Sequence, residues 1–182
     1  MKTAFLTIAI LILALASITS AQSATDKDAV RTATREKLRQ ALLDSGPKKG
    51  IEIAFRQSDK QPFNFVGVKR GGFVTAEGFE IVVGVSNDQT IGFRIYPYYK
   101  GGYINIDKAR NTTQLLRKIA QLNNTTFLFW GADDTGDVFT GYTFTLESGF
   151  PDEAIKIVIS SIKNSDQFVG EMRPSIDGSS AP

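Results

Sequence analysis

The strongest constraint on the fold is a block of alternating apolar and polar residues between positions 51 and 96. The block divides into four segments with this alternation, Ile51–Gln57, Phe63–Lys69, Phe79–Val85 and Ile91–Tyr96. A period of two indicates strands with one buried face. Short turn-forming segments such as Gly71-Gly72 and Asn87–Gln89 separate the strands. Strands joined by short turns pair antiparallel, so the block predicts an antiparallel meander. Pro97 is expected to end its last strand.

Helices are expected on both sides of this meander, because apolar residues there recur three or four positions apart. The predicted helices span Asp26–Asp44, a segment from about Lys108 or Thr112 to Leu122, and a segment from Pro151 to about Asn164, after which the pattern is lost. The pair Asn123-Asn124 should separate the second helix from a hairpin with strands Thr125–Trp130 and Asp137–Leu146. The sequence therefore predicts an α+β fold, with three helices and one antiparallel sheet, in the order helix–meander–helix–hairpin–helix.

The first residues have the features of an export signal. Lys2 is followed by an apolar run over residues 4–16 that only Thr7 interrupts, and small residues stand at Thr19 and Ala21. This predicts a signal peptide over residues 1–21, cut after Ala21, with an earlier cut after Ala16 left open. The apolar run is shorter than the about 20 residues of a spanning helix. We therefore expect a periplasmic or secreted protein without a membrane span after cleavage, with one domain over residues 22–176 and a disordered tail over 177–182.

Composition narrows the chemistry. The chain has no cysteine and no histidine, which excludes Ser–His and cysteine nucleophiles, Cys/His zinc sites and histidine-ligated haem. Of 21 basic residues only Lys2 lies in the predicted signal, so the mature chain has 20 basic and 19 acidic residues, a net charge of +1. Such a balance predicts no nucleic-acid partner. We expect a protein that is not an enzyme and that binds no cofactor or metal.

An acidic cluster allows a different chemistry. Asp133, Asp134 and Asp137 lie within five residues of each other, and paired carboxylates can bind calcium or cleave glycosides. The spacing does not match an EF-hand loop, because no Glu stands at the twelfth position from Asp133. Asp and Gly are also the residues that a tight hairpin turn requires, and we interpret the cluster as such a turn.

A tyrosine-rich segment is the candidate binding site. It contains Tyr96, Tyr98, Tyr99 and Tyr103, and tyrosine gives a broad contact surface with one polar end. The segment could bind a partner or stack against a sugar. The alternative is that two of the rings complete the core and the others cover it, since aromatic residues are common in strands.

The second half of the chain carries a family resemblance. A helix ending near an Asn pair runs into a strand over Leu115–Trp130, followed by the acidic turn Asp133–Val138, the strand Tyr142–Leu146 and the helix from Pro151. From about Leu38 to Ile176 this layout resembles the YbjN family of bacterial sensory transduction regulators, whose fold is similar to that of type III secretion chaperones. The resemblance implies no catalytic residues.

The resemblance and the export signal together suggest a function. Many similar domains lack such a signal, so a cytoplasmic role does not transfer. We expect an extracytoplasmic bacterial binding or regulatory module that recognises a protein or peptide and forms a homodimer in one version of this hypothesis. The alternative function is a carbohydrate- or cell-wall-binding protein that uses the tyrosine-rich surface, with Asp133 or Asp137 as an acid if it is an enzyme.

Overall fold

The computed structural model describes residues 26–44, 53–88, 90–145 and 150–181. The predicted signal peptide lies outside these ranges, as do Ile51, Glu52, Leu146 and Pro182. In the described part of the chain, no helix is both long enough and apolar enough to cross a membrane.

Seven strands of the described residues form one antiparallel sheet, with the spatial order β1-β2-β3-β4-β7-β6 and with β5 paired to β4. Their bounds are β1 Phe55–Gln57, β2 Asn64–Arg70, β3 Gly78–Val85, β4 Ile91–Tyr99, β5 Gly102–Tyr103, β6 Phe129–Ala132 and β7 Val138–Phe144. The predicted meander corresponds to β1–β4, and the predicted hairpin to β6 and β7. The pairing of β4 with β7 joins the meander and the hairpin into one sheet.

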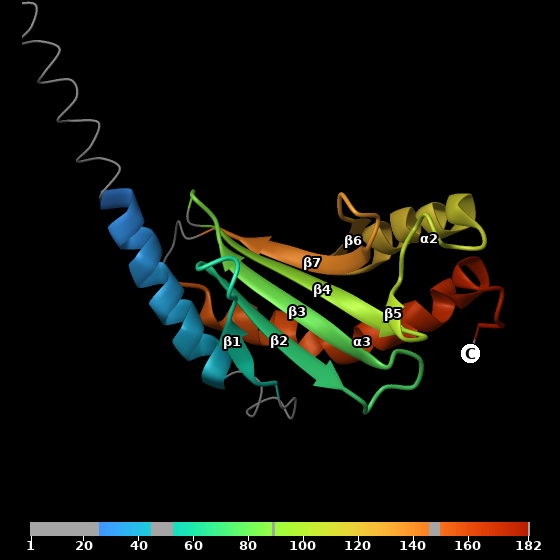
Figure 1. The fold of residues 1–182 in the computed structure, drawn as a ribbon, viewed down its shortest axis with the longest axis horizontal. Helices are drawn as coiled ribbons and strands as arrows, with labels where there is room; N and C mark the ends of the chain where they lie inside the picture. Colours follow the sequence, from blue (N-terminus) through green and yellow to red (C-terminus); the bar gives the residue numbers. More distant parts are fainter. Residues whose placement is uncertain (1–25, 45–52, 89, 146–149, 182) are drawn as a thin grey trace, which may run out of the picture.

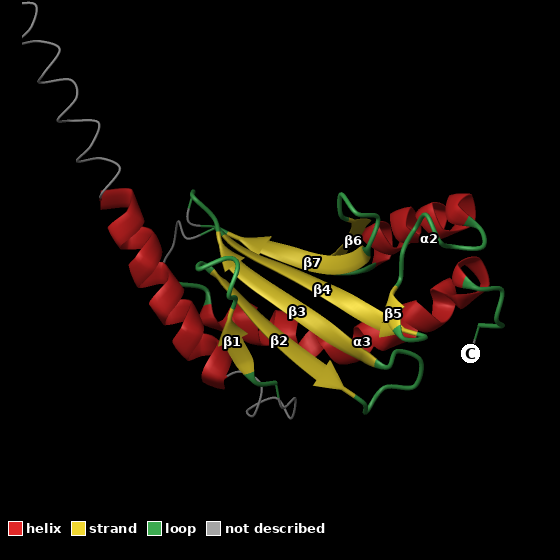
Figure 2. Ribbon diagram, viewed as in Figure 1, coloured by secondary structure: helices red, strands yellow, loops and turns green. Residues whose placement is uncertain are grey.

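Three helices pack around this sheet, so the predicted α+β class is confirmed (Figures 1 and 2). The N-terminal helix (residues 26–44) crosses one end of the sheet, and α3 (Asp152–Ile176) runs behind the strands, where it contacts β4 and β7 (Figure 1). The remaining helix, α2 (Thr112–Thr125), packs against α3 and β6. Between the helices and the sheet lies one apolar core, to which Leu38, Phe79, Ile95 and Ile159 contribute side chains of at most 1% exposure.

Two predicted element ends near α2 and β4 are wrong. Pro97 does not end its strand: β4 continues to Tyr99, and Pro97 lies opposite Phe79 on β3. The last pair of β4 with β7 is Ile95 with Thr140, so no β4–β7 ladder bond is lost at Pro97. The pair Asn123-Asn124 does not break the helix either, because α2 continues through it to Thr125 and the strand after it begins at Phe129.

The predicted end of the third helix is also wrong, since α3 continues twelve residues beyond Asn164, to Ile176. The polar residues that interrupt the apolar stripe, Ser165 and Asp166, are themselves buried. Beyond them Val169 and Met172 return to the core with no exposed surface. The backbone carbonyls of Ser175 and Ile176, at the end of α3, accept hydrogen bonds from the N–H groups that precede α2.

Candidate binding face

The two faces of the sheet differ, because successive side chains of a strand point to opposite faces. On β4, Phe93 and Ile95 point to α3 and are buried, whereas Arg94 on the same strand is exposed. We call the face that carries Arg94 the open face. Among the described residues no helix lies in front of β2, β3 and β4 on this side (Figure 1). The open face is therefore where a partner could approach the sheet.

The four predicted site tyrosines do not all share this face. Tyr96 and Tyr98 follow Arg94 at alternate positions, and Tyr103 on β5 is paired with Tyr98, so these three lie together on the open face. Tyr99 points the other way, and its hydroxyl donates a hydrogen bond of 2.9 Å to Asp177, just after α3. Asp177 is also ion-paired with Lys100. Tyr99 therefore connects β4 to the end of α3. Asp177, which accepts this hydrogen bond, is also the first residue of the predicted disordered tail.

Two phenylalanines extend the three tyrosines into a continuous row, which we call the aromatic strip: Tyr98, Tyr103, Tyr96, Phe139 and Phe129. Each ring centroid lies within 6 Å of the next, from 4.8 Å for the stacked Tyr98–Tyr103 pair to 5.7 Å for Phe129–Phe139. The row therefore crosses from β5 over β4 and β7 to β6. Phe129 is 42% exposed, whereas Tyr96 and Phe139 are buried, so Tyr96 covers the core more than it offers a contact surface.

Burial favours the neutral form of Tyr96 and Tyr103. The Tyr98 hydroxyl lies 3.1 Å from that of Tyr103 and 3.2 Å from Oε2 of Glu80. Burial raises the pKa of Tyr103, and the hydroxyl of Tyr98 and the carboxylate of Glu80 act in the same direction. Burial also raises the pKa of Tyr96, which the nearby Arg94 opposes. Tyr96 and Tyr103 are therefore uncharged at neutral pH.

A groove of about 500 Å³ lies beside the aromatic strip. Its floor contains Gly84 on β3 and Gly92 on β4, which are paired across the two strands. A Cβ atom added at Gly92 would meet no atom within 4 Å, so the backbone is bare there, whereas the Asn64 side chain covers Gly84. Glycine inside a strand often marks a place where another chain approaches closely. Arg94, Phe129 and Thr143 are among the residues along the sides of the groove.

The edges of the sheet are less accessible than this face. On the outer strand β6, the side-chain amide of Asn123 pairs with the backbone of Trp130: Nδ2 donates to the carbonyl at 3.0 Å, and Oδ1 accepts from the N–H at 2.5 Å. The amide thus occupies the position of a neighbouring strand and blocks addition of one. At the opposite edge, β1 has three residues. Recognition by the open face therefore agrees better with this structure than recognition at an edge.

The acidic cluster forms the turn between β6 and β7, as predicted. Asp133 Oδ1 accepts hydrogen bonds of 3.0 Å from the N–H groups of Thr135 and Asp137, and Gly136 has a positive φ of 80°. These hydrogen bonds outweigh burial and lower the pKa of Asp133. A general acid needs a raised pKa, so Asp133 is poorly suited to that role. The described residues contain no group of three or more acidic side chains arranged for a metal ion.

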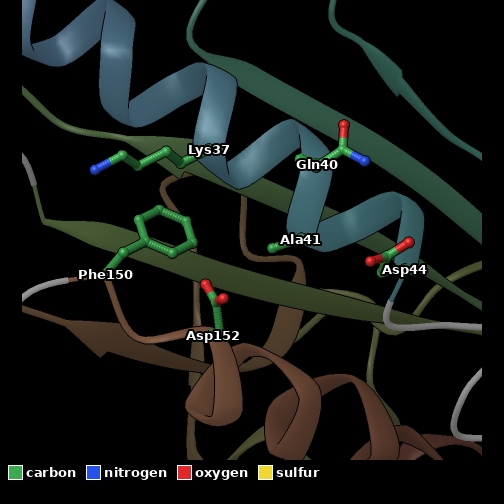
Figure 3. A pocket seen from close by; sticks show the side chains of 6 residues that line it. All are labelled: Lys37, Gln40, Ala41, Asp44, Phe150 and Asp152. Atoms are coloured by element: carbon green, nitrogen blue, oxygen red, sulfur yellow. The ribbon is translucent and has the colours of Figure 1, made fainter.

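A second depression, of about 320 Å³, lies between the N-terminal helix and the start of α3 (Figure 3). Its lining residues are Lys37, Gln40, Ala41, Asp44, Phe150 and Asp152. The Phe150 ring faces the helix from the other side of the gap (Figure 3). One basic side chain and two carboxylates around one aromatic ring form no recognisable catalytic set. We interpret this depression as part of the packing interface between the N-terminal helix and the start of α3.

Part of the open face could not be found from the sequence. Alternation along β4 places Arg94 with Tyr96 and Tyr98, and that signal was available. Phe129 and Phe139 join them only because β4 pairs with β7 and β6 pairs with β7, and no local sequence pattern predicts these pairings.

Comparisons of the chain with protein-family models, curated proteins and solved structures found no match.

Proposed function

We propose that this protein is an exported, non-enzymatic binding module that recognises a protein or peptide partner through the open face of its sheet. The observation that carries the proposal is the aromatic strip beside a groove whose floor is bare at Gly92, on a face where no described helix lies in front of β2, β3 and β4 (Figure 1). Aromatic and arginine side chains are enriched at protein interfaces, and Phe129 and Arg94 are exposed on this face. The apolar start of the chain supports export.

The resemblance to the YbjN family supports the same function. It implies a regulatory domain with a type III secretion chaperone-like fold, and the helix–meander–helix–hairpin–helix order of this chain is consistent with it. Such a module acts by holding another polypeptide, so it requires no catalytic residues. The predicted export signal places the partner in the bacterial envelope or outside the cell.

Site-specific photocrosslinking tests this function. A photoreactive p-benzoylphenylalanine replaces Val68 on the open face, or Ile157 on α3 as a control; their side chains are 36% and 51% exposed. In cells that make the protein, the Val68 probe should form a discrete adduct with a polypeptide that mass spectrometry identifies. The Ile157 probe should not form this adduct. Equal adducts from both positions, or none from Val68, would contradict the proposal.

The same rings allow the alternative function, binding of cell-wall carbohydrate. The stacked pair Tyr98 and Tyr103, with the Glu80 carboxylate beside it, combines an aromatic surface with a hydrogen-bond acceptor for sugar hydroxyls. Retention on purified cell-wall material that Tyr98→Ala abolishes, together with no polypeptide adduct at position 68, would favour this alternative.

A further inference from the structure

The charge of the groove indicates the chemistry of the partner. Among the described residues that line the groove, two are arginines, Arg31 and Arg94, and none is acidic. The mature chain as a whole is nearly neutral, so this local excess of positive charge is a property of the groove. Complementary charge at an interface contributes to specificity and to the association rate.

The two arginines have different roles. Arg31 is committed to the fold, because its Nε and Nη2 donate to the Val85 carbonyl at 3.0 and 2.7 Å and its guanidinium lies 3.6 Å from the Phe63 ring centroid. Arg94 is exposed and forms no salt bridge within the described part of the chain. Its guanidinium lies 4.9 Å from the centre of the Phe139 ring. This stacking orients a planar donor group at the side of the groove.

The carboxylates nearest the groove are engaged elsewhere. Asp88, in the turn after β3, accepts hydrogen bonds from Ser86 and Thr90. Asp133 accepts hydrogen bonds from backbone N–H groups of its own turn and also interacts with the Tyr96 hydroxyl at the groove, and Glu80 lies beside the Tyr98 hydroxyl. The guanidinium N–H groups of Arg94 are therefore available to bind the carboxylate of a partner.

We propose that the groove binds an acidic segment of the partner polypeptide, with an Asp or Glu carboxylate on Arg94 and the partner backbone against the bare floor at Gly92. This proposal rests on the proposed function and names its ligand class. Arginine pairs with carboxylates through two parallel hydrogen bonds, and such pairs are strong and directional. At Gly92 the bare backbone leaves room for the partner backbone to approach the sheet.

The test begins with a displayed library of random peptides selected on the mature domain. The enriched peptides should carry more Asp and Glu than the starting library. For the best synthetic peptide, Arg94→Ala should weaken binding about tenfold or more, measured by fluorescence anisotropy. Arg56→Ala is the matched control, because Arg56 lies on β1 and is paired with Asp59; it should change the dissociation constant less than about twofold.

A second pair of variants tests the floor without disturbing the fold. Gly92→Val places a side chain in open space on the floor of the groove, and valine is favourable in strands. It should abolish peptide binding and leave the unfolding midpoint unchanged or higher. Gly102→Val also adds a side chain in open space, on β5 outside the groove, and should bind like the wild type.

The outcomes separate the two proposals. Enrichment of neutral or basic peptides, or equal binding by Arg94→Ala and the wild type, would overturn the acidic-segment proposal and leave peptide recognition standing. If no peptide is enriched, and the photocrosslinking probe at position 68 forms no polypeptide adduct, both proposals fail. Replacing the acidic residues of the peptide by Asn or Gln should cost nothing further once Arg94 is alanine, because the two changes remove the same contact.

Discussion

Asp166 is the buried carboxylate that holds the loop between β2 and β3. Its two oxygens accept hydrogen bonds from three consecutive backbone N–H groups, those of Val74, Thr75 and Ala76, at 2.6 to 3.2 Å. Asp166 is 6% exposed and belongs to α3, so this contact joins the helix to a loop some ninety residues earlier. In sequence Asp166 lies just beyond about Asn164, where the loss of the apolar pattern predicts the end of the helix. In the structure the same residue is a tertiary anchor.

Replacing Asp166 by Asn should destabilise the protein by about 2 kcal/mol. The amide keeps the size of the side chain, but it has one acceptor oxygen and no charge, and hydrogen bonds to charged groups contribute about 1.5–3 kcal/mol. Urea unfolding measures the difference. Asp59→Asn is the control: Asp59 lies at the surface with its side chain 91% exposed, and its loss should cost less than about 0.5 kcal/mol. Equal costs would show that the loop anchor is unimportant.

Tyr103 should make stability sensitive to alkaline pH. Its pKa is raised from the ordinary value of 10.0, so the folded state favours the neutral phenol. The resulting stability is fully present below pH 10 and is lost as the pH rises toward the higher pKa of the folded state. Tyr103→Phe should therefore lose less stability than the wild type between neutral and alkaline pH in urea unfolding.

Direct titration of tyrosinate absorbance provides a second readout for Tyr103. In the folded wild type, part of the absorbance rise should be delayed beyond the ordinary pKa of 10.0, and Tyr103→Phe should reduce this delayed part. The same chain unfolded in guanidinium chloride should show no delay in either form. An identical delayed part in the variant and the wild type would contradict the assignment to Tyr103.

At the scale of elements, the sequence predicts the kind of each segment better than its end. The apolar stripe of α3 includes Ile155, Val158 and Ile162 as predicted, and all are fully buried. The helix continues past Asn164 because Ser165 donates to the Ser161 carbonyl within the helix and a distant loop satisfies Asp166. A propensity argument does not contain the tertiary contact of Asp166. Pro97 shows the same limit of sequence-based prediction. The sequence does not reveal that β4 stops pairing with β7 at Ile95, two residues before the proline.

The edge of β6 depends on the side chain of Asn123. Asn123→Ala should cost about 1–2 kcal/mol, because the N–H and carbonyl of Trp130 lose their partner, and it should increase self-association through the freed edge. Urea unfolding and light scattering measure the two effects. Asn124→Ala changes the same residue type at the next, exposed position of α2, and should alter neither. Similar behaviour of both variants would show that Asn123 does not protect the edge.

At the scale of the whole molecule, the class and the order of elements were predictable, whereas the candidate site was predictable only in part. Alternation placed Tyr96 and Tyr98 on one face, and it also separates Tyr99 from them. The groove, however, combines residues from β3, β4, β6 and β7 with the N-terminal helix. The non-local β4–β7 pairing brings these segments together. Its register is set by which faces bury apolar residues across the whole sheet, and no single segment contains that information.

The last part of α3 tests whether the core behaves as one unit. A chain that stops after Asn164 lacks Val169 and Met172, each fully buried, and burial of such side chains contributes about 1.5–3 kcal/mol each. It also lacks the Asp166 anchor and Phe168, whose ring lies 6.1 Å from that of Trp130. The sum is comparable to the about 5–15 kcal/mol that stabilises a whole domain. This chain should therefore fail to fold, with the fluorescence of Trp130 at the wavelength of an unfolded protein. A chain that stops after Ser179 keeps every one of these contacts and should unfold like the full-length protein. If the shorter chain folds cooperatively with a buried Trp130, the end of α3 is an accessory to the core and not part of it.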